Sequence, residues 1–366
     1  MLVAVLGGGQ LGRMLGLAGI PLGLRSRFLD PSPDAPARAV GELVVGAFDD
    51  PDALEEVARG ADVVTYEFEN VPAASARALA GRAPVLPPPE ALEAAQDRLA
   101  EKRLFERCGI PVAPYVPVDR EEDLPGAIEA LGLPAVLKAR RLGYDGKGQA
   151  VVRSAQDAGP AWAAVGAAPS ILEALVPFER ELSVLAVRGR DGEVRVYPVV
   201  ENVHRGGVLR VSRAPAPDLP EGLGEAASAY VRRALEALGY VGVLAIELFQ
   251  AGGELLANEM APRVHNSGHW TIEGAATSQF ENHLRAILGL PLGAAEARGQ
   301  AAMVNLIGRL PDPSRLLAVP GAHLHVYGKS PRPGRKLGHV TVLAPDRETL
   351  EERLAEVLRA VGEAGS

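Results

Sequence analysis

The first fifteen residues, MLVAVLGGGQLGRML, join a short apolar run to a glycine-rich turn and then to a helical pattern. The turn fits G-x-G-x-x-G through Gly7, Gly9 and Gly12. A second apolar run ends in Asp30, about twenty residues further on, where dinucleotide-binding folds place the acid that binds a ribose. These features alone favour a nicotinamide- or flavin-dependent oxidoreductase, and the rest of the chain has to support or replace that interpretation.

Strand and helix patterns alternate in the first part of the chain, which predicts a parallel α/β domain over residues 1–95. The expected strands are Leu2–Leu6, Arg25–Leu29, Glu42–Val45 and Asp62–Tyr66, and the expected helices are Gln10–Ala18, Pro51–Arg59 and Pro72–Ala80. In an open parallel sheet, ligands bind beyond the carboxyl ends of the strands, so we expect the glycine turn and Glu69 of YEFENVP on one rim. Prolines 87–89 predict a linker to the next domain.

Two further regions follow the prolines. Residues 96–175 contain a helical stretch, DRLAEKRLFERCGI, and strand patterns on both sides of a glycine loop, which predicts a small α+β domain with a flap. Residues 176–366 are richer in strand patterns and predict a larger mixed α+β domain, with a terminal subdomain from about residue 300 and a closing helix over Arg347–Val361.

Composition narrows the class of protein. The net charge of −8 argues against a general nucleic-acid binder. Apolar runs stay short of the ~20 residues that span a membrane, which argues against a membrane protein. The single cysteine, Cys108, cannot form an internal disulfide, which favours the cytoplasm. Only five lysines stand among the 38 basic residues, and four of them lie beside glycine-rich or arginine-rich motifs, where a compact ammonium suits a phosphate.

A predicted hairpin carries the first chemical signal. In VLAIELFQ-AGG-ELLANEMAPR, Glu247 lies in an apolar strand, and the turn brings Glu259 of the returning strand nearly opposite. Two carboxylates this close repel each other unless a cation lies between them or one is protonated. Oxygen ligands suit Mg²⁺, which shares phosphate oxygens with a nucleotide. The alternative is an exposed strand face with two unrelated acids.

The glycine loop VLKARRLGYDGKGQ carries the second signal. Lys138 ends one strand and Lys147 lies within the loop, so backbone N–H groups and two ammonium groups can approach phosphate oxygens. The alternative is a surface hairpin whose glycines serve only the turn.

Two polar clusters complete the candidate site. NEMAPRVHNSGHWT places Arg263, His265 and Asn266 directly after the second hairpin strand, which favours an anion or polar-substrate site. His265 and His269 have the spacing of a zinc pair, but Asn-Ser-Gly argues against the helix that such a pair needs. The second cluster, YGKSPRPGRKLGH, is either a solvated basic loop or a phosphate site, and the other anion-binding candidates favour the phosphate.

Taken together, these residues resemble the ATP-grasp superfamily. Within it, GGGQLGRML, YEFENVP, QDRLAEK, GYDGKGQ, NEMAPRVHNSGH and RPGRKLGH closely resemble the 5-(carboxyamino)imidazole ribonucleotide synthase family, in order from residue 1 to about residue 343. The resemblance implies α/β and α+β architecture: an ATP-grasp fold with a parallel pre-ATP-grasp domain, a flap domain and a C-terminal mixed domain. It also implies that the glycine turn faces a ribonucleotide and exposes helix N–H groups to an anion, while Asp30 only ends a strand.

The resemblance further implies an activity. ATP phosphorylates bicarbonate to carboxyphosphate, and the exocyclic amine of 5-aminoimidazole ribonucleotide is then carboxylated, with release of ADP and phosphate, in purine biosynthesis. ATP and Mg²⁺ are the implied cofactors and a homodimer is the implied assembly. Phosphoryl transfer needs charge neutralisation and alignment, and a labile acyl phosphate needs a flap that excludes water, so the parts agree with the reaction.

Site residues follow from the resemblance position by position. The implied catalytic residues are Arg263, Lys147 and Asp145. The implied nucleotide-binding residues are Arg98, Lys138, Gly143, Tyr144, Asp145, Gly146, Lys147, Gly148, Gln149, Glu173, Ala174, Leu175, Val176, Glu181, His204, Asn258 and Glu259. The implied ribonucleotide-binding residues are Gln10, Leu11, Glu69, Tyr144, Lys147, Arg263, His265, Asn266, Lys329, Arg335 and Lys336, and the implied metal ligands are Glu247 and Glu259.

Two departures and three alternatives stand beside this interpretation. Leu142 and Val264 occupy places associated with glycine and proline in the family, which points to altered loop dynamics. The alternatives are another ATP-grasp ligase, such as a formate-dependent glycinamide ribonucleotide transformylase, the oxidoreductase suggested by the first thirty residues, and a catalytically silent binding module.

Overall fold

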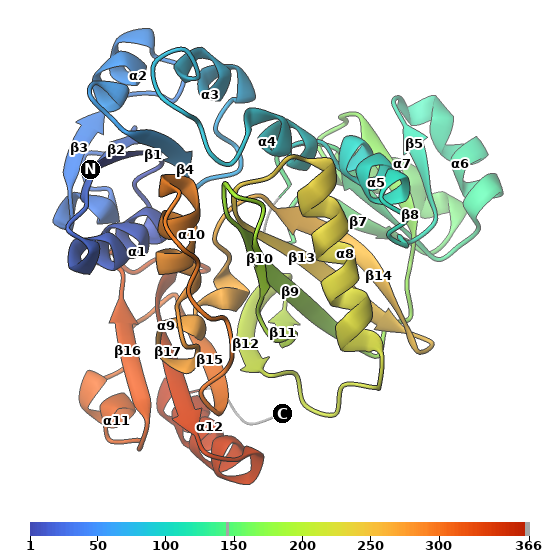
Figure 1. Cartoon of the computed structure of the whole chain (residues 1–366). Helices are drawn as coiled ribbons and strands as arrows, with labels where there is room; N and C mark the ends of the chain where they lie inside the picture. Colours follow the sequence, from blue (N-terminus) through green and yellow to red (C-terminus); the bar gives the residue numbers. More distant parts are fainter. Residues whose placement is uncertain (144–145, 363–366) are drawn as a thin grey trace.

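The computed structural model describes residues 1–143 and 146–362, and these residues form three β-sheets (Figure 1). Tyr144 and Asp145 of the glycine loop lie outside the described residues. No helix in the described part of the chain is long and apolar enough to cross a lipid bilayer.

The N-terminal sheet is parallel and has the strand order β3-β2-β1-β4. Its strands and helices are β1 (Leu2–Leu6), α1 (Gln10–Gly19), β2 (Arg25–Asp30), β3 (Glu42–Val45), α2 (Pro51–Ala58), β4 (Val63–Tyr66) and α3 (Ala73–Leu79), with short 3₁₀ helices at Ile20–Leu22 and Pro36–Ala39. Every residue of β1 is buried, as expected of a central parallel strand with helices on both faces. The predicted parallel α/β architecture is therefore confirmed.

The second sheet is antiparallel, has the order β5-β8-β6-β7, and carries the flap. This part contains α4 (Pro89–Ala95), α5 (Arg98–Arg107), β5 (Tyr115–Val118), α6 (Leu124–Leu131), β6 (Ala135–Ala139), β7 (Gln149–Val152), α7 (Ala158–Ala164) and β8 (Ser170–Ala174), with 3₁₀ turns at Glu121–Asp123 and Ala155–Asp157. Leu137, Trp162 and Leu172 belong to its own small hydrophobic core. We use "flap loop" for residues 140–148, between β6 and β7.

The third sheet has nine strands in the order β14-β13-β9-β11-β12-β15-β17-β16, with β10 paired to β9. Its elements are β9 (Arg180–Arg188), β10 (Val194–Val196), β11 (Val200–Arg205), β12 (Val208–Ala214), α8 (Leu223–Ala237), β13 (Gly242–Ala251), β14 (Glu254–Ala261), a 3₁₀ turn at Asn266–Gly268, α9 (Thr271–Gly274), α10 (Gln279–Leu288), β15 (Gln300–Ile307), α11 (Pro313–Leu317), β16 (Ala322–Val326), β17 (Lys336–Ala344) and α12 (Arg347–Val361). Because β15 pairs with β12, the strands after residue 300 extend the same sheet.

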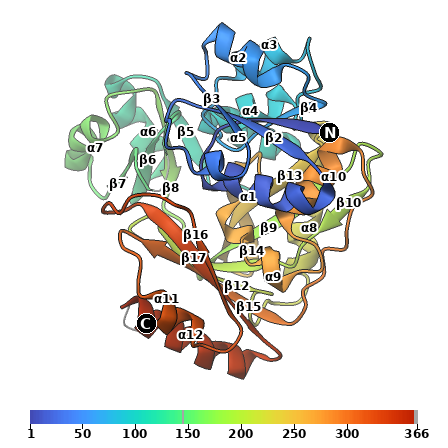
Figure 2. The same ribbon diagram turned by 90° about the vertical axis from the view of Figure 1, so that its left-hand side faces the viewer.

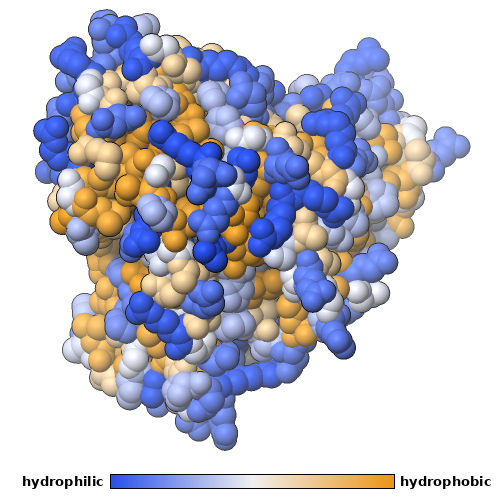
Figure 3. Space-filling view, viewed as in Figure 1, coloured by the Kyte–Doolittle hydropathy of each residue, from blue (hydrophilic) through white to orange (hydrophobic). Residues whose placement is uncertain are grey.

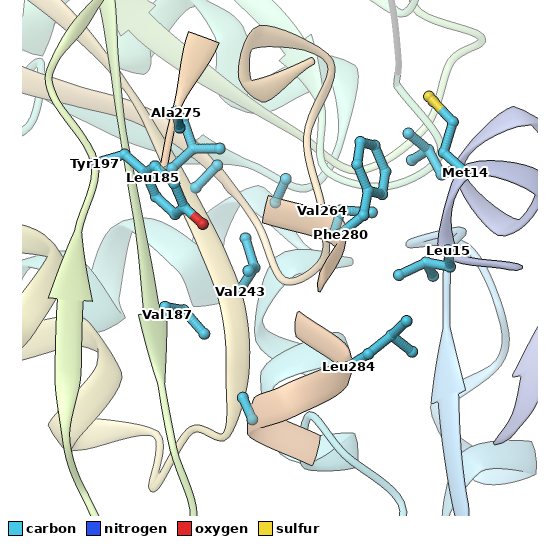
Figure 4. Close-up of a cluster of buried hydrophobic side chains, with 14 of the residues drawn as sticks. Met14, Leu15, Leu185, Val187, Tyr197, Val243, Val264, Ala275, Phe280 and Leu284 are labelled. Carbon is cyan, nitrogen blue, oxygen red and sulfur yellow. The ribbon is translucent and has the colours of Figure 1, made fainter. Parts of the chain in front are cut away.

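A single hydrophobic cluster joins the N-terminal domain to the third sheet. Met14 and Leu15 of α1 face Phe280 and Leu284 of α10, and the cluster continues to β9 and β13 (Figure 4). Burying four such side chains contributes roughly 1.5–3 kcal/mol for each one, measured against an exposed side chain. This packing fixes the carboxyl ends of β1 and β4 relative to the third sheet, which the site described below requires.

Two elements differ from the sequence prediction. The stretch predicted as a proline linker contains helix α4, because Pro89 occupies a first-turn position where its missing N–H costs nothing. β15 was not predicted, although its apolar residues are buried between β12 and β17. Figure 3 shows that apolar residues gather on the left of this face, over the N-terminal domain. Leu17 of α1 and Ile20 of the 3₁₀ helix that follows it are exposed.

Candidate functional site

Glu247 and Glu259, which the hairpin pattern predicts to be nearly opposite, pair directly on β13 and β14. Burial and the neighbouring Glu259 charge raise the pKa of Glu247 to about 7. Burial also opposes ionisation of Glu259, but the Arg98 guanidinium, 2.8 Å from Oε2, outweighs it and lowers the pKa of Glu259. Glu259 is therefore held in its ionised form, while a negative charge on Glu247 is poorly compensated by its surroundings. This arrangement favours a cation between the two carboxylates.

The donor set fits Mg²⁺ and does not fit zinc. Among the described residues, no group of three or more His, Cys, Asp or Glu side chains is arranged to hold a metal. A pair of carboxylates suits an ion that takes its other ligands from water and nucleotide phosphates. His265 and His269 do not form a pair, because His269 packs against Phe280 and His339 while His265 Nε2 approaches Glu247 at 3.3 Å.

Lys138, at the end of β6, reaches toward the same two strands. Its Nζ lies 2.8 Å from Glu173 Oε2 and 3.2 Å from Asn258 Oδ1. Burial opposes ionisation of Glu173, but Lys138 and Lys102 outweigh it and lower its pKa. Glu173, one of the implied nucleotide-binding residues, thus has its carboxylate buried against two lysines, and its side chain holds Lys138 next to Asn258.

The segment that links the second sheet to the third lies next to these groups. Ala174, Leu175 and Val176 connect β8 to β9, and the Leu175 N–H donates to the Pro134 carbonyl oxygen at 3.3 Å. Phe178 and Phe249 stack with ring centroids 4.7 Å apart. This strand-to-strand segment therefore presents backbone groups and an aromatic pair at one side of the carboxylate pair.

His204 of β11 and Glu181 of β9 contact each other through His204 Nδ1 and Glu181 Oε2. Burial opposes protonation of His204, but the hydrogen bond to Glu181 and the Glu247 charge raise its pKa. The structure thus brings together two residues that the sequence comparison placed on the nucleotide.

The flap loop lies against two parts of the molecule. A Cβ on Gly143 would lie 3.4 Å from Arg98 Nη2, so the loop passes close to the arginine that pairs with Glu259. Gly146 has φ +75, and its Cβ would lie 2.9 Å from Gly207 Cα in the β11–β12 turn. Leu142, at a position that the resemblance associates with glycine, has φ 64 and is exposed, so this chain places a side chain in a conformation that favours glycine.

Gly146→Ala tests whether this contact closes the flap. We expect turnover to fall on the order of 100-fold, because the new Cβ meets backbone that cannot move aside and also imposes left-handed strain. The matched control is Gly166→Ala in the same domain, since Gly166 has φ +86 and open space around it. Steady-state ADP release compares the two, and equal losses would show that backbone strain alone explains the effect.

Two carboxylates of the N-terminal domain occupy the glycine turn. Glu67 accepts hydrogen bonds from the N–H groups of Gly9 at 2.8 Å and Gly12 at 3.1 Å, and Asp30 accepts from Gly8 at 2.9 Å. Burial raises the pKa of Glu67 and these N–H groups oppose the shift. A Cβ on Gly7 would lie 2.6 Å from Glu67 Cγ, so the glycine there makes room for this side chain.

The expectation of an external anion is therefore wrong for the N–H groups of Gly8, Gly9 and Gly12, and it stays a prediction for the Leu11 backbone. The chain supplies the anion itself, because a buried carboxylate needs donors and the amino end of a helix provides them. Asp30 does more than end a strand, since its carboxylate accepts a hydrogen bond from the Gly8 N–H of the turn. A dinucleotide pyrophosphate would have to displace both carboxylates.

The predicted ribonucleotide-binding residues meet between the N-terminal domain and the third sheet. Arg263 Nε donates to Glu69, and Lys329 Nζ donates to Gln10. In Figure 2 the β16–β17 hairpin rises from the third sheet toward the N-terminal domain, which brings Lys329 to α1. Leu11 is buried in the core, so only its backbone can contact a ligand.

His265 carries its proton on Nε2. Ser267 donates to His265 Nδ1 from its backbone N–H at 3.4 Å, and the Ser267 hydroxyl lies 2.8 Å from the same nitrogen. Burial lowers the pKa of His265 well below its ordinary range, so the neutral ring has Nε2–H directed at Glu247. The Asn266 amide is shielded from solvent and has no hydrogen-bond partner among the described residues, as suits a group that binds a ligand.

Arg335 and Lys336 lie where the basic loop enters β17. Arg335 Nη1 donates to the Ser330 carbonyl oxygen at 3.2 Å, which folds the loop on itself. Burial lowers the pKa of Lys329, and the neighbouring Arg335 and Lys336 charges lower it further. A cluster of cations in which each positive charge disfavours protonation of its neighbours is typical of an anion-binding site.

Sequence reasoning missed three groups that hold this geometry. Glu67 occupies the glycine turn, and Glu101 and Lys102 of α5 are almost completely buried against β14. The available signal was the spacing of Arg98, Glu101 and Lys102, which places all three on one helix face.

Comparisons with known families agree with this geometry. Three family models match consecutive segments: a ribonucleotide synthetase preATP-grasp domain over residues 1–96, an ATP-grasp domain over residues 103–280 and a phosphoribosylaminoimidazole carboxylase C-terminal domain over residues 301–353. A protein named N5-carboxyaminoimidazole ribonucleotide synthase from Pseudomonas aeruginosa is 52% identical over 357 residues, covering 98% of both chains.

Solved structures give the same result. The N5-carboxyaminoimidazole ribonucleotide synthetase of Thermus thermophilus has a TM-score of 0.96 and 60% identity, covering 100% of both chains. The N5-carboxyaminoimidazole synthase of Aspergillus clavatus, solved in complex with ADP and 5-aminoimidazole ribonucleotide, has a TM-score of 0.92 and 34% identity, covering 99% of this chain and 98% of that one.

Proposed function

The chain belongs to the N5-carboxyaminoimidazole ribonucleotide synthase family of ATP-grasp ligases, and we propose that the residues around Glu247 and Glu259 are its active site. It is a ligase of purine biosynthesis that uses ATP to carboxylate 5-aminoimidazole ribonucleotide. The observation that carries the site assignment is the direct pairing of the two carboxylates beside Lys138 and Arg98, in reach of the Arg263 and His265 cluster.

The reaction has two balanced steps. An oxygen of bicarbonate attacks the γ-phosphorus of ATP, the bond to the β–γ bridging oxygen breaks, and ADP leaves. The exocyclic amine of the ribonucleotide then attacks the carboxyl carbon of carboxyphosphate, the carbon–oxygen bond to phosphorus breaks, and phosphate leaves as the amine loses a proton. Mg²⁺ held by Glu247 and Glu259 would neutralise charge on the phosphates.

The nucleotide half is assigned to the second and third sheets. Lys138 and Arg98 bind phosphate oxygens, because Arg98 contacts Glu259 and Lys138 contacts the neighbouring Asn258, so both cations lie next to the carboxylate pair. The flap loop and the first residue of β7 are assigned to the phosphates through Gly143, Tyr144, Asp145, Gly146, Lys147, Gly148 and Gln149. Backbone groups of 173–176 receive the adenine, and Glu181 with His204 binds the ribose side.

The ribonucleotide half is assigned to the interface of the N-terminal domain and the third sheet. Lys329, Arg335 and Lys336 bind the 5′-phosphate, where their mutual repulsion is relieved by a dianion. Arg263 stabilises the carboxyphosphate, since Glu69 orients its guanidinium beside the carboxylate pair. Gln10, the Leu11 backbone, His265 and Asn266 complete the pocket.

The same proposal includes the domain boundaries, the cellular location and the oligomeric state. The domains are residues 1–95, 96–175 and 176–366, with a terminal subdomain from about 300. The enzyme works in the cytoplasm, as its single cysteine and its place in nucleotide synthesis indicate. It forms a homodimer, for which the exposed side chains of Leu17 in α1 and Ile20 just after it offer an apolar surface, and sedimentation equilibrium measures the mass directly.

Isotope transfer tests the carboxyphosphate step. With bicarbonate labelled in its oxygens, we expect one labelled oxygen in the phosphate product, because the attacking oxygen stays on phosphorus when the carbon–oxygen bond breaks. Phosphate is analysed by mass after a single short incubation. Phosphate without the label would mean that water, not bicarbonate, receives the phosphoryl group.

A further inference from the structure

The β13–β14 hairpin contains an irregularity at the site. Leu248 pairs with Ala257 and Glu247 pairs with Glu259, so Asn258 is an extra residue on β14 and forms a β-bulge. Side chains alternate between the two faces of a strand, and in a regular register Asn258 would lie opposite Glu247. Glu259 would then share the face of Ala257, which packs in the apolar core below α8. The bulge is therefore what places Glu259 opposite Glu247.

A bulge interrupts the ladder and leaves backbone groups that need other partners. Helix α5 supplies them. Lys102 Nζ donates to the carbonyl oxygens of Ala257 at 3.3 Å and Asn258 at 3.0 Å, and Glu101 accepts from the Met260 N–H at 2.6 Å. These two adjacent side chains therefore form hydrogen bonds with the β14 backbone on both sides of Glu259.

The two side chains are held in place by burial and by charge. Glu101 is 2% exposed and Lys102 is 1% exposed, so neither exchanges its partners for water. Lys102 also lies 3.5 Å from Glu173 Oε1, whose other oxygen binds Lys138. The contacts of Lys102 thus extend from the bulge to the lysine assigned to the nucleotide phosphates.

We infer that Glu101 and Lys102 are positioning residues, which fix the Asn258 bulge so that Glu259 faces Glu247 and Lys138 lies beside them. This inference rests on the proposed function, because the geometry that they maintain is that of the carboxylate pair. Neither residue touches the reacting atoms. Their effect should therefore appear in cation affinity and in turnover, while the ribonucleotide pocket, built from other elements, keeps its affinity.

Cation binding to the full chain tests the inference. Mn²⁺ is titrated in the presence of ADP, and free Mn²⁺ is measured by electron paramagnetic resonance. Lys102→Met and Glu101→Leu are expected to weaken Mn²⁺ binding by about 10–100-fold, the usual effect of losing a group that orients metal ligands. Glu101→Gln keeps an oxygen that accepts the Met260 N–H, so it should stay within about threefold of the unaltered chain.

Controls separate positioning from a general loss of structure. Arg103→Met removes a cation from the exposed face of the same helix and should leave Mn²⁺ binding unchanged. Lys102→Gln, which keeps one shorter donor, should give an intermediate loss and serves if Lys102→Met does not fold. The KM for 5-aminoimidazole ribonucleotide should stay within about twofold in each folded variant while kcat falls.

Four outcomes would overturn the inference. Unchanged Mn²⁺ affinity in Lys102→Met or Lys102→Gln, or equal losses in Glu101→Gln and Glu101→Leu, would remove the positioning role and leave the proposed function standing. A KM for the ribonucleotide that rises as much as kcat falls would indicate a general structural role. If the unaltered chain with ADP does not bind Mn²⁺, the assigned metal site fails and this inference fails with it.

Discussion

Glu259→Gln is expected to reduce turnover by on the order of 10³-fold while the protein stays folded. The substitution keeps the shape of the side chain and removes its charge. Arg98 then loses the carboxylate it contacts at 2.8 Å, and Glu247 faces an amide that is a poor ligand for a hard cation. Initial rates of ADP release at several Mg²⁺ concentrations measure the loss, and circular dichroism verifies the fold.

The control for this change lies on the same strand. Glu254→Gln removes a charge at the exposed start of β14, far from the carboxylate pair in the register, and should leave the rate unaltered. A Glu259→Gln protein within about tenfold of the normal rate at saturating Mg²⁺ would contradict the assignment of Glu259 as a ligand.

Arg263→Lys is expected to lower kcat by about 10²–10³-fold, the usual effect of removing one donor aimed at developing charge. Lysine keeps the positive charge but lacks the planar fork. Arg263 uses Nε for Glu69 and Nη1 for the Val264 carbonyl oxygen at 3.0 Å, so a single ammonium cannot reproduce both contacts. The KM for ATP should change little, because Arg98 and Lys138 supply that half of the site.

Steady-state kinetics with each substrate varied in turn distinguishes the possible roles of Arg263. Arg298→Lys, at an exposed arginine outside the site, is the matched control. A large increase in the KM for ATP with kcat unaltered would place Arg263 on the nucleotide instead of the carboxyphosphate.

The sequence alone predicts much of the fold because local patterns coincide with tertiary structure. The alternation of strands and helices in the first domain holds, since β1 is buried on both faces and α2 begins at Pro51 with Asp50 as its cap. The closeness of Glu247 and Glu259 also follows from the hairpin, although their direct pairing depends on the bulge at Asn258. Family motifs identify the reaction, which periodicity cannot do.

Other features depend on contacts that a linear pattern does not contain. In the sequence, Glu67 is only one of the two acids in YEFENVP. In the fold, it follows β4 and accepts hydrogen bonds from the glycine turn that follows the neighbouring strand β1. Lys102 reads as a surface residue of a charged helix, and only tertiary packing buries it. The bulge at Asn258 leaves no mark in the strand pattern, although it decides which way Glu259 faces.

The oxidoreductase interpretation fails on the same physical ground. The N–H groups that a dinucleotide would need are already bonded to Glu67 and Asp30. Titration with NADH should therefore give no saturable fluorescence change at the glycine turn. Tight, saturable binding would require both carboxylates to leave it.

Acceptor-dependent ADP release tests the central claim most directly. The protein is incubated with ATP and Mg²⁺, with bicarbonate present or absent, and with either 5-aminoimidazole ribonucleotide or glycinamide ribonucleotide plus formate. We predict rapid ADP release only when bicarbonate and 5-aminoimidazole ribonucleotide are both present. ADP release that follows glycinamide ribonucleotide plus formate and ignores 5-aminoimidazole ribonucleotide would contradict it.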